Sequence, residues 1–327
     1  MLGTRHALVS KMTTHPLVLK VAVFYNRAHM SLEEQIEKRF GLRAAQCQYL
    51  NTPVNDVIAV TAPSGRFALK VYNPQSRTAK EVQWELDLIE HLIQHGAPVA
   101  RPIRGSSGYV EPFIVDGQER AAALFEWAFG EKPSPAHDTY TLLGRAAAQI
   151  HKAADTFTPS SVRDDYDATV LIDEQLQRME AHLTEAKRWQ QAVALGDRLK
   201  QLIANPSLDR GICHMDLTLD NVHRDGRTLT VFDFDSAGVC WRAIEPYGVL
   251  RVSKGYFKAW LDGYRSVRAF SQGDEKAVAA FGIIGDLRVV AWKLGVARSS
   301  RGKPILLASD MLRVVDEWLE WERNNIY

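Results

Sequence analysis

The chain of 327 residues has few cysteines and no apolar run long enough to cross a membrane. Cys47, Cys213 and Cys240 are scattered and lack Cys-x-x-Cys spacing, so neither a disulfide framework nor a structural zinc site is indicated. We expect a reducing, cytoplasmic location. The apolar stretch at residues 17–25 is too short for a membrane span, and we expect no membrane association.

Neither sign of charge dominates. The chain has 40 Lys and Arg and 39 Asp and Glu, a net charge of +1, and no dense basic run. This predicts no nucleic-acid partner. It neither supports nor excludes a small anionic ligand, because one cleft can be basic on a neutral protein. The length allows a large core and two lobes.

The order of the expected elements indicates an α+β fold with two lobes. Residues 1–30 form a weakly specified N-terminal extension. A β-rich lobe over residues 31–127 begins with a helix, where Ser31 and Glu34 form a capping box. A mainly helical lobe covers residues 128–327, and Gly130, Pro133 and Pro135 mark the boundary. Two such lobes leave a cleft between them, which is a usual place for a ligand.

Hydrophobic periodicity and turn signals place the individual elements. The expected strands cover residues 43–50, 56–61, 66–72, 107–115, 119–126 and 228–232. The expected helices cover residues 31–41, 78–94, 139–154, 170–186 and 190–203, with further helical patterns from about residue 246 to the end.

A lysine in an apolar strand needs an explanation. In the segment 67–71, alternation places Ala68 and Lys70 on one face and three apolar residues on the other. A small residue beside a lysine suits a nucleotide, because Ala68 leaves room for adenine and Lys70 reaches phosphate oxygens. A solvated sheet face would also accept the lysine.

The following helix contains a carboxylate inside its apolar stripe. Glu85 lies between Ile89 and Leu92 on the helical projection. An unpaired buried carboxylate is costly, so Glu85 requires a cation, and Lys70 on the preceding strand is the natural partner. The alternative is that Glu85 reaches solvent at the rim of the stripe.

The segment from Cys213 to Asp235 carries the strongest functional signal. Asp216 and Asn221 are five residues apart in a polar loop, and an apolar strand then leads to Asp233 and Asp235. The layout suits phosphoryl transfer: one carboxylate takes a proton from a hydroxyl, while an amide and a second carboxylate hold Mg²⁺ on a nucleotide's phosphates. Each residue alone would be an ordinary loop residue.

These residues resemble the aminoglycoside phosphotransferase and choline kinase superfamily, which has a protein-kinase-like fold. The similarity lies in the segments His214 to Asn221 and Val231 to Asp235, and it covers roughly residues 32–292. Within this superfamily, the sequence most resembles type II homoserine kinases and the bacterial stress-response Ser/Thr kinase. The similar segments are residues 67–72, 95–99, 143–151 and 238–242.

The resemblance implies roles for individual residues. Asp216 would be the catalytic base, and His214 would brace its loop. The implied metal ligands are Asn221 and Asp233, with Asp235 as a further contact.

The resemblance also implies an ATP site. Lys70, paired with Glu85, would hold the α- and β-phosphates, and the turn with Thr52 and Asn55 would cap them. The adenine pocket would be formed by the hinge at Glu126 and Trp127, with Ala68 and Phe232 as lining residues.

Three features depart from the family pattern, and one of them is the segment Thr218-Leu219-Asp220, which replaces the insert that usually precedes the asparagine. Met215 stands where glycine is usual, and glycine permits backbone conformations that methionine avoids. Glu245 stands where an aspartate is usual, as a structural support of the loop. A glycine-rich loop of the Gly-x-Gly-x-x-Gly type is also absent from the sequence.

The sequence therefore predicts an ATP-dependent, Mg²⁺-dependent phosphotransferase that acts on a hydroxyl of a small molecule, of the aminoglycoside, homoserine or amino-alcohol type. One alternative is a Ser/Thr protein kinase with a protein acceptor. Another is a non-catalytic nucleotide-binding regulator, suggested by Met215 and Glu245. The sequence gives neither the acceptor nor the oligomeric state.

Overall fold

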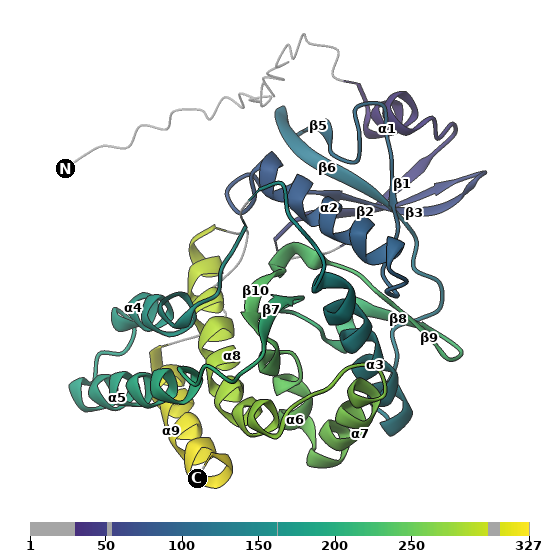
Figure 1. Cartoon of the computed structure of the whole chain (residues 1–327). Coiled ribbons are helices and arrows are strands. Elements are labelled where there is room, and N and C mark those ends of the chain that lie inside the picture. Colours follow the sequence, from purple (N-terminus) through teal and green to yellow (C-terminus); the bar gives the residue numbers. More distant parts are fainter. Residues whose placement is uncertain (1–29, 51–53, 162, 300–307, 327) are drawn as a thin grey trace, which may run out of the picture.

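The computed structural model describes residues 30–50, 54–161, 163–299 and 308–326. A small lobe built on an antiparallel sheet lies above a larger, mainly helical lobe (Figure 1). This confirms the predicted α+β class with two unequal lobes. The predicted extension, except for Met30, lies outside the described residues. The last strand of the sheet ends at Glu126, and the boundary at residue 127 stays a prediction.

The small lobe holds two helices and six strands among its described residues. Its elements are α1 (Leu32–Phe40), β1 (Gln46–Leu50), β2 (Asp56–Ala62), β3 (Gly65–Val71), α2 (Ala79–Gln94), β4 (Pro102–Ile103), β5 (Glu111–Val115) and β6 (Gln118–Glu126). The sheet order is β1-β2-β3-β6-β4, with β5 also pairing β6. The strand expected over residues 107–115 begins only at Glu111.

The helices of the small lobe begin where their capping signals stand. Ser31 accepts a hydrogen bond from the N–H of Glu34, and the Glu34 carboxylate accepts from the N–H of Ser31. Thr78 and Glu81 form the same reciprocal pair at the start of α2. These pairs satisfy N–H groups that the helix itself leaves open.

The sheet separates two apolar clusters. Leu69 and Val71 of β3 lie in the cluster that Ile36 of α1 covers. Ala123 and the apolar stripe of α2 belong to the main core, which continues into the larger lobe. Lys70 of β3 therefore points to the side of the sheet where α2 packs, away from Leu69, as the alternation predicted.

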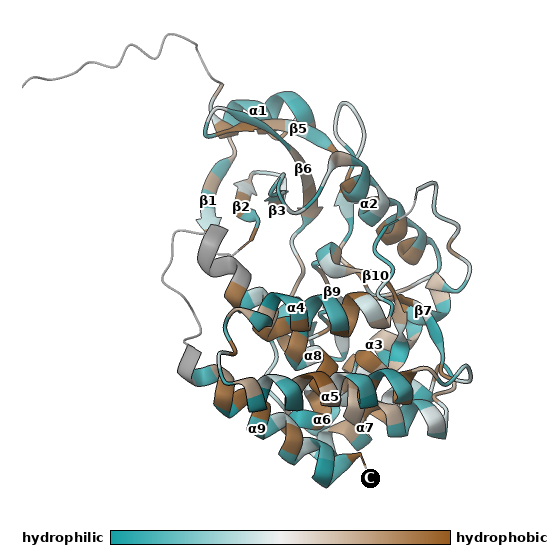
Figure 2. Ribbon diagram, turned by 90° about the vertical axis from the view of Figure 1, so that its left-hand side faces the viewer, coloured by the Kyte–Doolittle hydropathy of each residue, from teal (hydrophilic) through white to brown (hydrophobic). Residues whose placement is uncertain are grey.

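The larger lobe combines helices with two short antiparallel ladders, β7–β10 and β8–β9. Its elements are α3 (His137–Ala154), α4 (Glu174–Glu180), α5 (Ala186–Ile203), β7 (Arg210–Cys213), β8 (Val222–Asp225), β9 (Thr228–Val231), β10 (Gly238–Trp241), α6 (Tyr247–Val252), α7 (Lys254–Arg265), α8 (Gln272–Ser299) and α9 (Ala308–Asn325). In Figure 2 these helices carry both apolar and polar segments, as expected of helices with one buried side.

The single helix predicted over residues 170–186 is wrong. A π-helical turn, Thr169–Asp173, leads into α4, which ends at Glu180, and α5 begins at Ala186. The intervening turn buries the side chain of Leu183, whose N–H bonds to the carbonyl oxygen of Met179. A continuous helix and a turn that buries Leu183 share the same apolar spacing, so periodicity alone does not separate them.

Close packing of α3 against α7 forms the base of the larger lobe. A Cβ at Gly144 would lie 2.0 Å from the carbonyl oxygen of Trp260, so only glycine allows this approach. Trp260 and Tyr264 stack in the core with ring centroids 4.9 Å apart.

A segment of the larger lobe returns to the small lobe. This interlobe strap, residues 155–161 and 163–168, lies between α3 and α4. The ring of Phe157 meets Trp84 of α2 edge-on, with centroids 5.7 Å apart, and Ser160 donates to the Asp87 carboxylate. The strap therefore ties α2 to the larger lobe.

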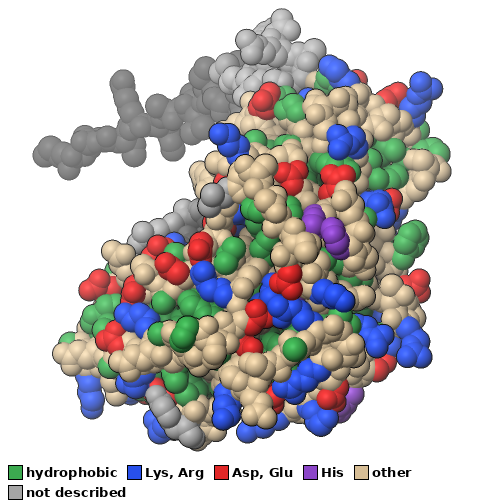
Figure 3. Space-filling model, in the orientation of Figure 1, with side chains coloured by type: hydrophobic (Ala, Val, Ile, Leu, Met, Phe, Trp, Pro, Cys, Tyr) green, Lys and Arg blue, Asp and Glu red, His purple; other side chains and the backbone are tan. Residues whose placement is uncertain are grey.

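Acidic and basic side chains are interspersed on the face drawn in Figure 3. Among the described residues, none of the helices combines the length and the hydropathy needed to cross a membrane.

Candidate active site

Both lobes contribute charged side chains to one cluster. The Lys70 ammonium on β3 donates to Glu85 Oε1 at 3.3 Å and to Asp233 Oδ1 at 2.7 Å. The ion pair predicted between Lys70 and Glu85 is therefore present. Asp233 follows β9 in the larger lobe, so Lys70 joins the two lobes. Tyr72 also donates to Glu85 Oε1, at 3.1 Å.

Charge pairing favours the ionised forms of Lys70 and Asp233. Burial alone would lower the pKa of Lys70, but the Asp233 and Glu85 carboxylates raise it well above its usual value. Burial would raise the pKa of Asp233, but the Lys70 ammonium and its hydrogen bond hold it below the usual value. The Asp233 side chain is 45% exposed, whereas that of Glu85 is 1% exposed. Asp233 thus keeps a face toward the cleft and Glu85 does not.

The predicted catalytic loop brings Asp216 and Asn221 together. Asn221 Nδ2 donates to both the backbone oxygen and the Oδ2 atom of Asp216, each at 2.8 Å. The pKa of Asp216 is raised, chiefly because the surrounding protein removes water from the carboxylate, and the Asp233 charge adds to this rise. A raised pKa makes a carboxylate a better proton acceptor in a nucleotide cleft.

Met215 has a backbone φ of +69°, in the left-handed region that glycine adopts without strain. This explains why a glycine is usual at the position. His214 supports the same loop: its Nε2 lies 3.0 Å from the carbonyl oxygen of Phe232, and its Nδ1 accepts from the N–H of Asp216 at 3.3 Å. The loop therefore holds the glycine-like shape with a methionine side chain.

Glu245 binds the backbone of the catalytic loop. Its Oε1 atom accepts from the N–H groups of His214 at 2.5 Å and of Met215 at 3.3 Å. Glu245 and the nearby side chains of His151 and Cys213 have three buried potential metal-ligand atoms within 4.8 Å of one another. His151 Nε2 lies 3.6 Å from Glu245 Oε1, and that oxygen is already committed to the loop. The group is therefore explained as a buried support of the catalytic loop.

Asp235 is surrounded by donors from three segments. Asn55 Nδ2 donates to its Oδ2 atom at 3.2 Å, while Arg77 and Arg163 both donate to its backbone oxygen. Arg163, from the interlobe strap, also lies 3.6 Å from Glu85 Oε2. These contacts leave Asp235 less open to a metal than Asp233.

Sequence reasoning missed Arg77 and Arg163. Arg77 precedes the cap of α2, but it reads as an ordinary solvated residue. Arg163 comes from a segment without regular structure, and its side chain is fully buried between Glu85, Asp235 and the Trp84 ring. No local signal in the sequence marks it.

The residues predicted to surround a nucleotide come from β3 and from the ends of β6 and β9. Ala68 pairs with Phe125 across the β3–β6 ladder, and Phe232 follows β9. The N–H groups of Glu126 and Trp127 are engaged by the carbonyl oxygens of Arg101 and Arg66. A hinge here would have to use other backbone groups.

Thr52 lies outside the described residues. Its partner in the predicted phosphate cap, Asn55, contacts Asp235 and accepts from the N–H of Asn73 at 3.0 Å.

A cavity of about 230 Å³ opens beside Asp216. Its walls come from the catalytic loop, α3 and the segment leading into α6. The lining residues are Tyr140, Leu143, Met215, Asp216, Leu217, Thr218, Leu219, Ile244, Glu245, Tyr247, Gly248, Val249 and Val252.

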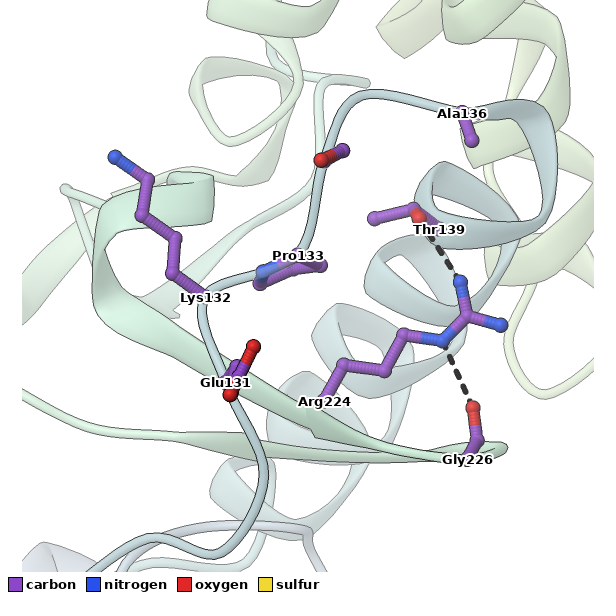
Figure 4. A pocket seen from close by; sticks show the side chains of 8 residues that line it. Glu131, Lys132, Pro133, Ala136, Thr139, Arg224 and Gly226 are labelled. Atoms are coloured by element: carbon purple, nitrogen blue, oxygen red, sulfur yellow. Dashed lines mark hydrogen bonds between the residues drawn. The ribbon is translucent and has the colours of Figure 1, made fainter.

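A larger open hollow of about 400 Å³ lies at the predicted lobe boundary. Figure 4 shows Arg224 reaching across it, with hydrogen bonds to Thr139 and to the carbonyl oxygen of Gly226. Lys132, also in its wall, pairs with Asp220. Neither Asp216 nor Lys70 lines this hollow, so it is separate from the candidate active site.

Comparison with known proteins agrees with this geometry. The model of the phosphotransferase enzyme family matches residues 54–280. An uncharacterized protein of Deinococcus radiodurans is 30% identical over 78% of each chain. Amicoumacin kinase of Bacillus subtilis is 27% identical over 64% of this chain and 65% of its own. A homoserine kinase of Methylobacillus glycogenes is 26% identical over 67% and 69%.

Solved structures share the fold. An amicoumacin kinase in complex with AMP-PNP, Ca²⁺ and Ami superposes with a TM-score of 0.73 at 19% identity, over 89% of this chain and 92% of that one. A microcompartment-associated aminopropanol kinase gives 0.72 at 22% identity, over 86% and 92%. These neighbours confirm the predicted kinase-like fold.

The fold and the site define a kinase-type phosphotransferase. The chain belongs to the phosphotransferase enzyme family, as the resemblance predicted. The predicted enzyme class, an ATP-dependent phosphotransferase with an alcohol group as acceptor, is confirmed with it.

Proposed function

We propose that the enzyme transfers the γ-phosphoryl group of ATP to a hydroxyl of a small molecule, with Asp216 as the base. The observation that carries this proposal is the 2.7 Å contact between Lys70 of the small lobe and Asp233 of the larger lobe. It brings a cation suited to phosphate and a carboxylate suited to a metal ion side by side, and the charge of Asp233 acts on Asp216.

Asp216 would orient the acceptor hydroxyl and take its proton as the new oxygen–phosphorus bond forms. The hydrogen bond from Asn221 fixes the direction of the carboxylate, and the raised pKa of Asp216 favours proton uptake. Holding the hydroxyl in line with the phosphoryl group supplies much of the rate through positioning.

Asn221 and Asp233 would hold Mg²⁺. Carboxylate and amide oxygens are the hard ligands that this ion prefers. Asn221 directs its amide nitrogen to Asp216, which leaves the amide oxygen as its ligand atom. Bound Mg²⁺ would neutralise charge on the phosphate oxygens. Asp235, held by Asn55 and two arginines, would help to position the metal-binding segment.

The nucleotide would lie between β3 and β9. Lys70 would contact the α- and β-phosphates while Glu85 holds it in place, and Thr52 and Asn55 would cap them. Ala68 and Phe232 would line the adenine pocket, and backbone groups at Glu126 and Trp127 other than their engaged N–H groups would form its hinge. ATP as donor and the free thiols of the described cysteines support a cytoplasmic location.

The cavity beside Asp216 supports a small acceptor over a protein serine. About 230 Å³ of partly enclosed space holds a compact molecule, whereas a peptide would require an open groove. The similarity to homoserine and amicoumacin kinases is in keeping with this choice.

The test is acceptor-stimulated ATP turnover with a panel of amino alcohols, hydroxylated amino acids and aminoglycosides, with the phosphorylated product identified by mass. Asp216→Asn should abolish product formation and retain ATP binding. Asp220→Asn is the matched control, because Asp220 is an exposed carboxylate of the same loop that pairs with Lys132. Equal product from the wild type and Asp216→Asn would rule out Asp216 as the base.

A further inference from the structure

Arg288 of α8 lies next to the proposed base without belonging to the nucleotide site. Its Nη1 donates to the carbonyl oxygen of Met215 at 3.3 Å, and its guanidinium lies 5.1 Å from the centre of the Tyr166 ring. Met215 immediately precedes Asp216. A fixed cation therefore stands at the acceptor side of the catalytic loop.

Arg288 differs from the other cations of the cleft in having no acidic partner. Lys70, Arg77 and Arg163 each pair with carboxylates. Within the residues that the structure describes, no carboxylate lies at ion-pair distance from Arg288, and its one hydrogen bond uses a single donor. A guanidinium is always charged and has five donors, so most of its binding capacity is uncommitted.

Tyr247 connects α8 to the acceptor cavity. A Cβ at Gly285, one turn earlier on α8, would lie 2.4 Å from the Tyr247 ring, so the missing side chain lets α8 approach that ring. Tyr247 also lines the cavity beside Asp216. One turn beyond Arg288, Trp292 is 40% exposed. Arg288 does not itself line the cavity, but two residues that do line it, Met215 and Tyr247, contact α8 at Arg288 and next to Gly285.

Most of the cavity wall is uncharged. Its two acidic lining residues are Asp216 and Glu245, and Glu245 Oε1 is already bonded to the catalytic loop. The other lining residues are apolar, tyrosine, threonine or glycine. An uncharged carbon skeleton fits these walls, and an anionic group fits the uncommitted guanidinium.

Building on the function proposed above, we infer that the acceptor is a small hydroxy acid. Its hydroxyl lies at Asp216, its carbon skeleton lies in the cavity beside Tyr247, and its carboxylate binds Arg288. A guanidinium binds a carboxylate through two parallel charge-assisted hydrogen bonds, which lysine cannot reproduce. Arg288 would therefore determine specificity, while Asp216 carries out proton transfer.

The test uses acceptors in matched pairs that differ only in charge: 4-hydroxybutyrate with 4-hydroxybutyramide, and homoserine with homoserine amide. Aminopropanol and kanamycin serve as cationic acceptors. Phosphorylated product is quantified for the wild type, Arg288→Gln and Arg288→Lys. Arg251→Gln is the control, because Arg251 is an arginine of α6 that is already paired with Asp286 of α8. Thermal unfolding confirms that each variant is folded.

The wild type should prefer the acid of each pair by about 100-fold in kcat/KM, as expected of a charge-assisted pair. Arg288→Gln should lose that preference, because its kcat/KM should fall much more for the acids than for the amides, and Arg288→Lys should be intermediate. Better wild-type turnover of the amides, of aminopropanol or of kanamycin would overturn the inference, as would an equal loss in Arg288→Gln with every acceptor. That last result would indicate that Arg288 contacts the transferred phosphoryl group instead of the acceptor.

Failure of the proposed function would look different. The wild type would then phosphorylate none of the acceptors while still binding ATP, and both proposals would fall together. A loss of charge preference with product formation intact overturns only the role of Arg288.

Discussion

At the scale of single residues, Met215 shows how a functional loop keeps a strained backbone. Its φ of +69° is a conformation that costs a non-glycine residue about 1–2 kcal/mol. Its buried side chain lines the cavity, and its backbone is held by Glu245 and Arg288. The surrounding contacts therefore outweigh the strain.

Comparing two truncations of Met215 isolates that strain. Met215→Gly and Met215→Ala remove nearly the same side chain, but only glycine accepts φ of +69° without cost. We expect the glycine variant to have the larger free energy of unfolding, by about 1 kcal/mol, in chemical denaturation. Leu217 is buried but its backbone lies outside the left-handed region. At this position the alanine variant should have the larger free energy of unfolding. The same order at both positions would show that the loop is unstrained.

The raised pKa of Asp216 predicts a dependence of activity on pH. The base works only when it is deprotonated, so kcat/KM should fall as the pH drops through a pKa above the ordinary aspartate value of 3.8. The measurement is the pH profile of kcat/KM at saturating ATP, with unfolding followed in parallel. An acid limb at or below 3.8 would contradict the assignment.

The same shift predicts an effect on stability. A carboxyl whose pKa is raised by folding stabilises the protein below the unfolded pKa, and this contribution is lost as the pH rises through the folded pKa. Ionised Asp216 should therefore cost stability at neutral pH, and Asp216→Asn should be at least as stable as the wild type at pH 7. Measured at pH 4 and pH 7, the advantage of the variant should grow with pH; a decrease would contradict the expected sign.

At the scale of elements, the interlobe strap holds α2 against the larger lobe. Arg163 from the strap lies between Glu85 of α2 and the backbone of Asp235, and Phe157 packs on Trp84. The carboxylate that orients Lys70 is thus fixed from both lobes. We expect the lysine to be held ready for phosphate before the nucleotide binds.

Removing the Arg163 side chain should uncouple these elements. Arg163→Ala leaves Glu85 with one less cation in a buried site, and breaking such a pair costs about 3–5 kcal/mol of unfolding free energy. The KM for ATP should rise as Lys70 loses its fixed partner. Denaturant unfolding and ATP titration measure both effects. Arg178→Ala, at an exposed pair with Glu174, should cost less than about 1 kcal/mol, and an equally small cost at Arg163 would refute the role of the strap.

The elements that bear local signals were predictable from sequence. The capping box at Ser31 locates α1, the apolar periodicity of residues 78–94 locates α2, and alternation around Lys70 gives its face. Glu85 inside an apolar stripe demanded a cation, and Lys70 is that cation. The contact between Lys70 and Asp233 could not be derived in this way, because it joins residues 163 positions apart.

Features that depend on tertiary packing were not predictable. The turn at Leu183 interrupts a pattern that reads as one helix, because burial rather than periodicity decides where the chain turns. Arg163 and Arg288 stand in segments whose sequence gives no sign of their partners. Each acquires its environment only when the lobes or helices pack together.

At the scale of the whole molecule, the nucleotide should clamp the two lobes through Lys70 and Asp233. ATP with Mg²⁺ at about 100 times its Kd should add about 2.7 kcal/mol to the free energy of unfolding, seen as a rise in Tm. Removing Mg²⁺ with a chelator should reduce the rise in Tm. In Asp233→Asn the rise in Tm caused by ATP should no longer depend on Mg²⁺. An equal rise with and without Mg²⁺ would exclude Asp233 and Asn221 as a metal site.

The central claim is that Asp216 is the base of a phosphoryl transfer in this cleft. Its most direct test is the single-turnover rate of γ-phosphoryl transfer to the best acceptor of the panel, for the wild type and Asp216→Asn at equal nucleotide occupancy. We predict a loss of about 100-fold or more in Asp216→Asn, with ATP affinity unchanged and Asp220→Asn at the wild-type rate. A wild-type transfer rate in Asp216→Asn would contradict it.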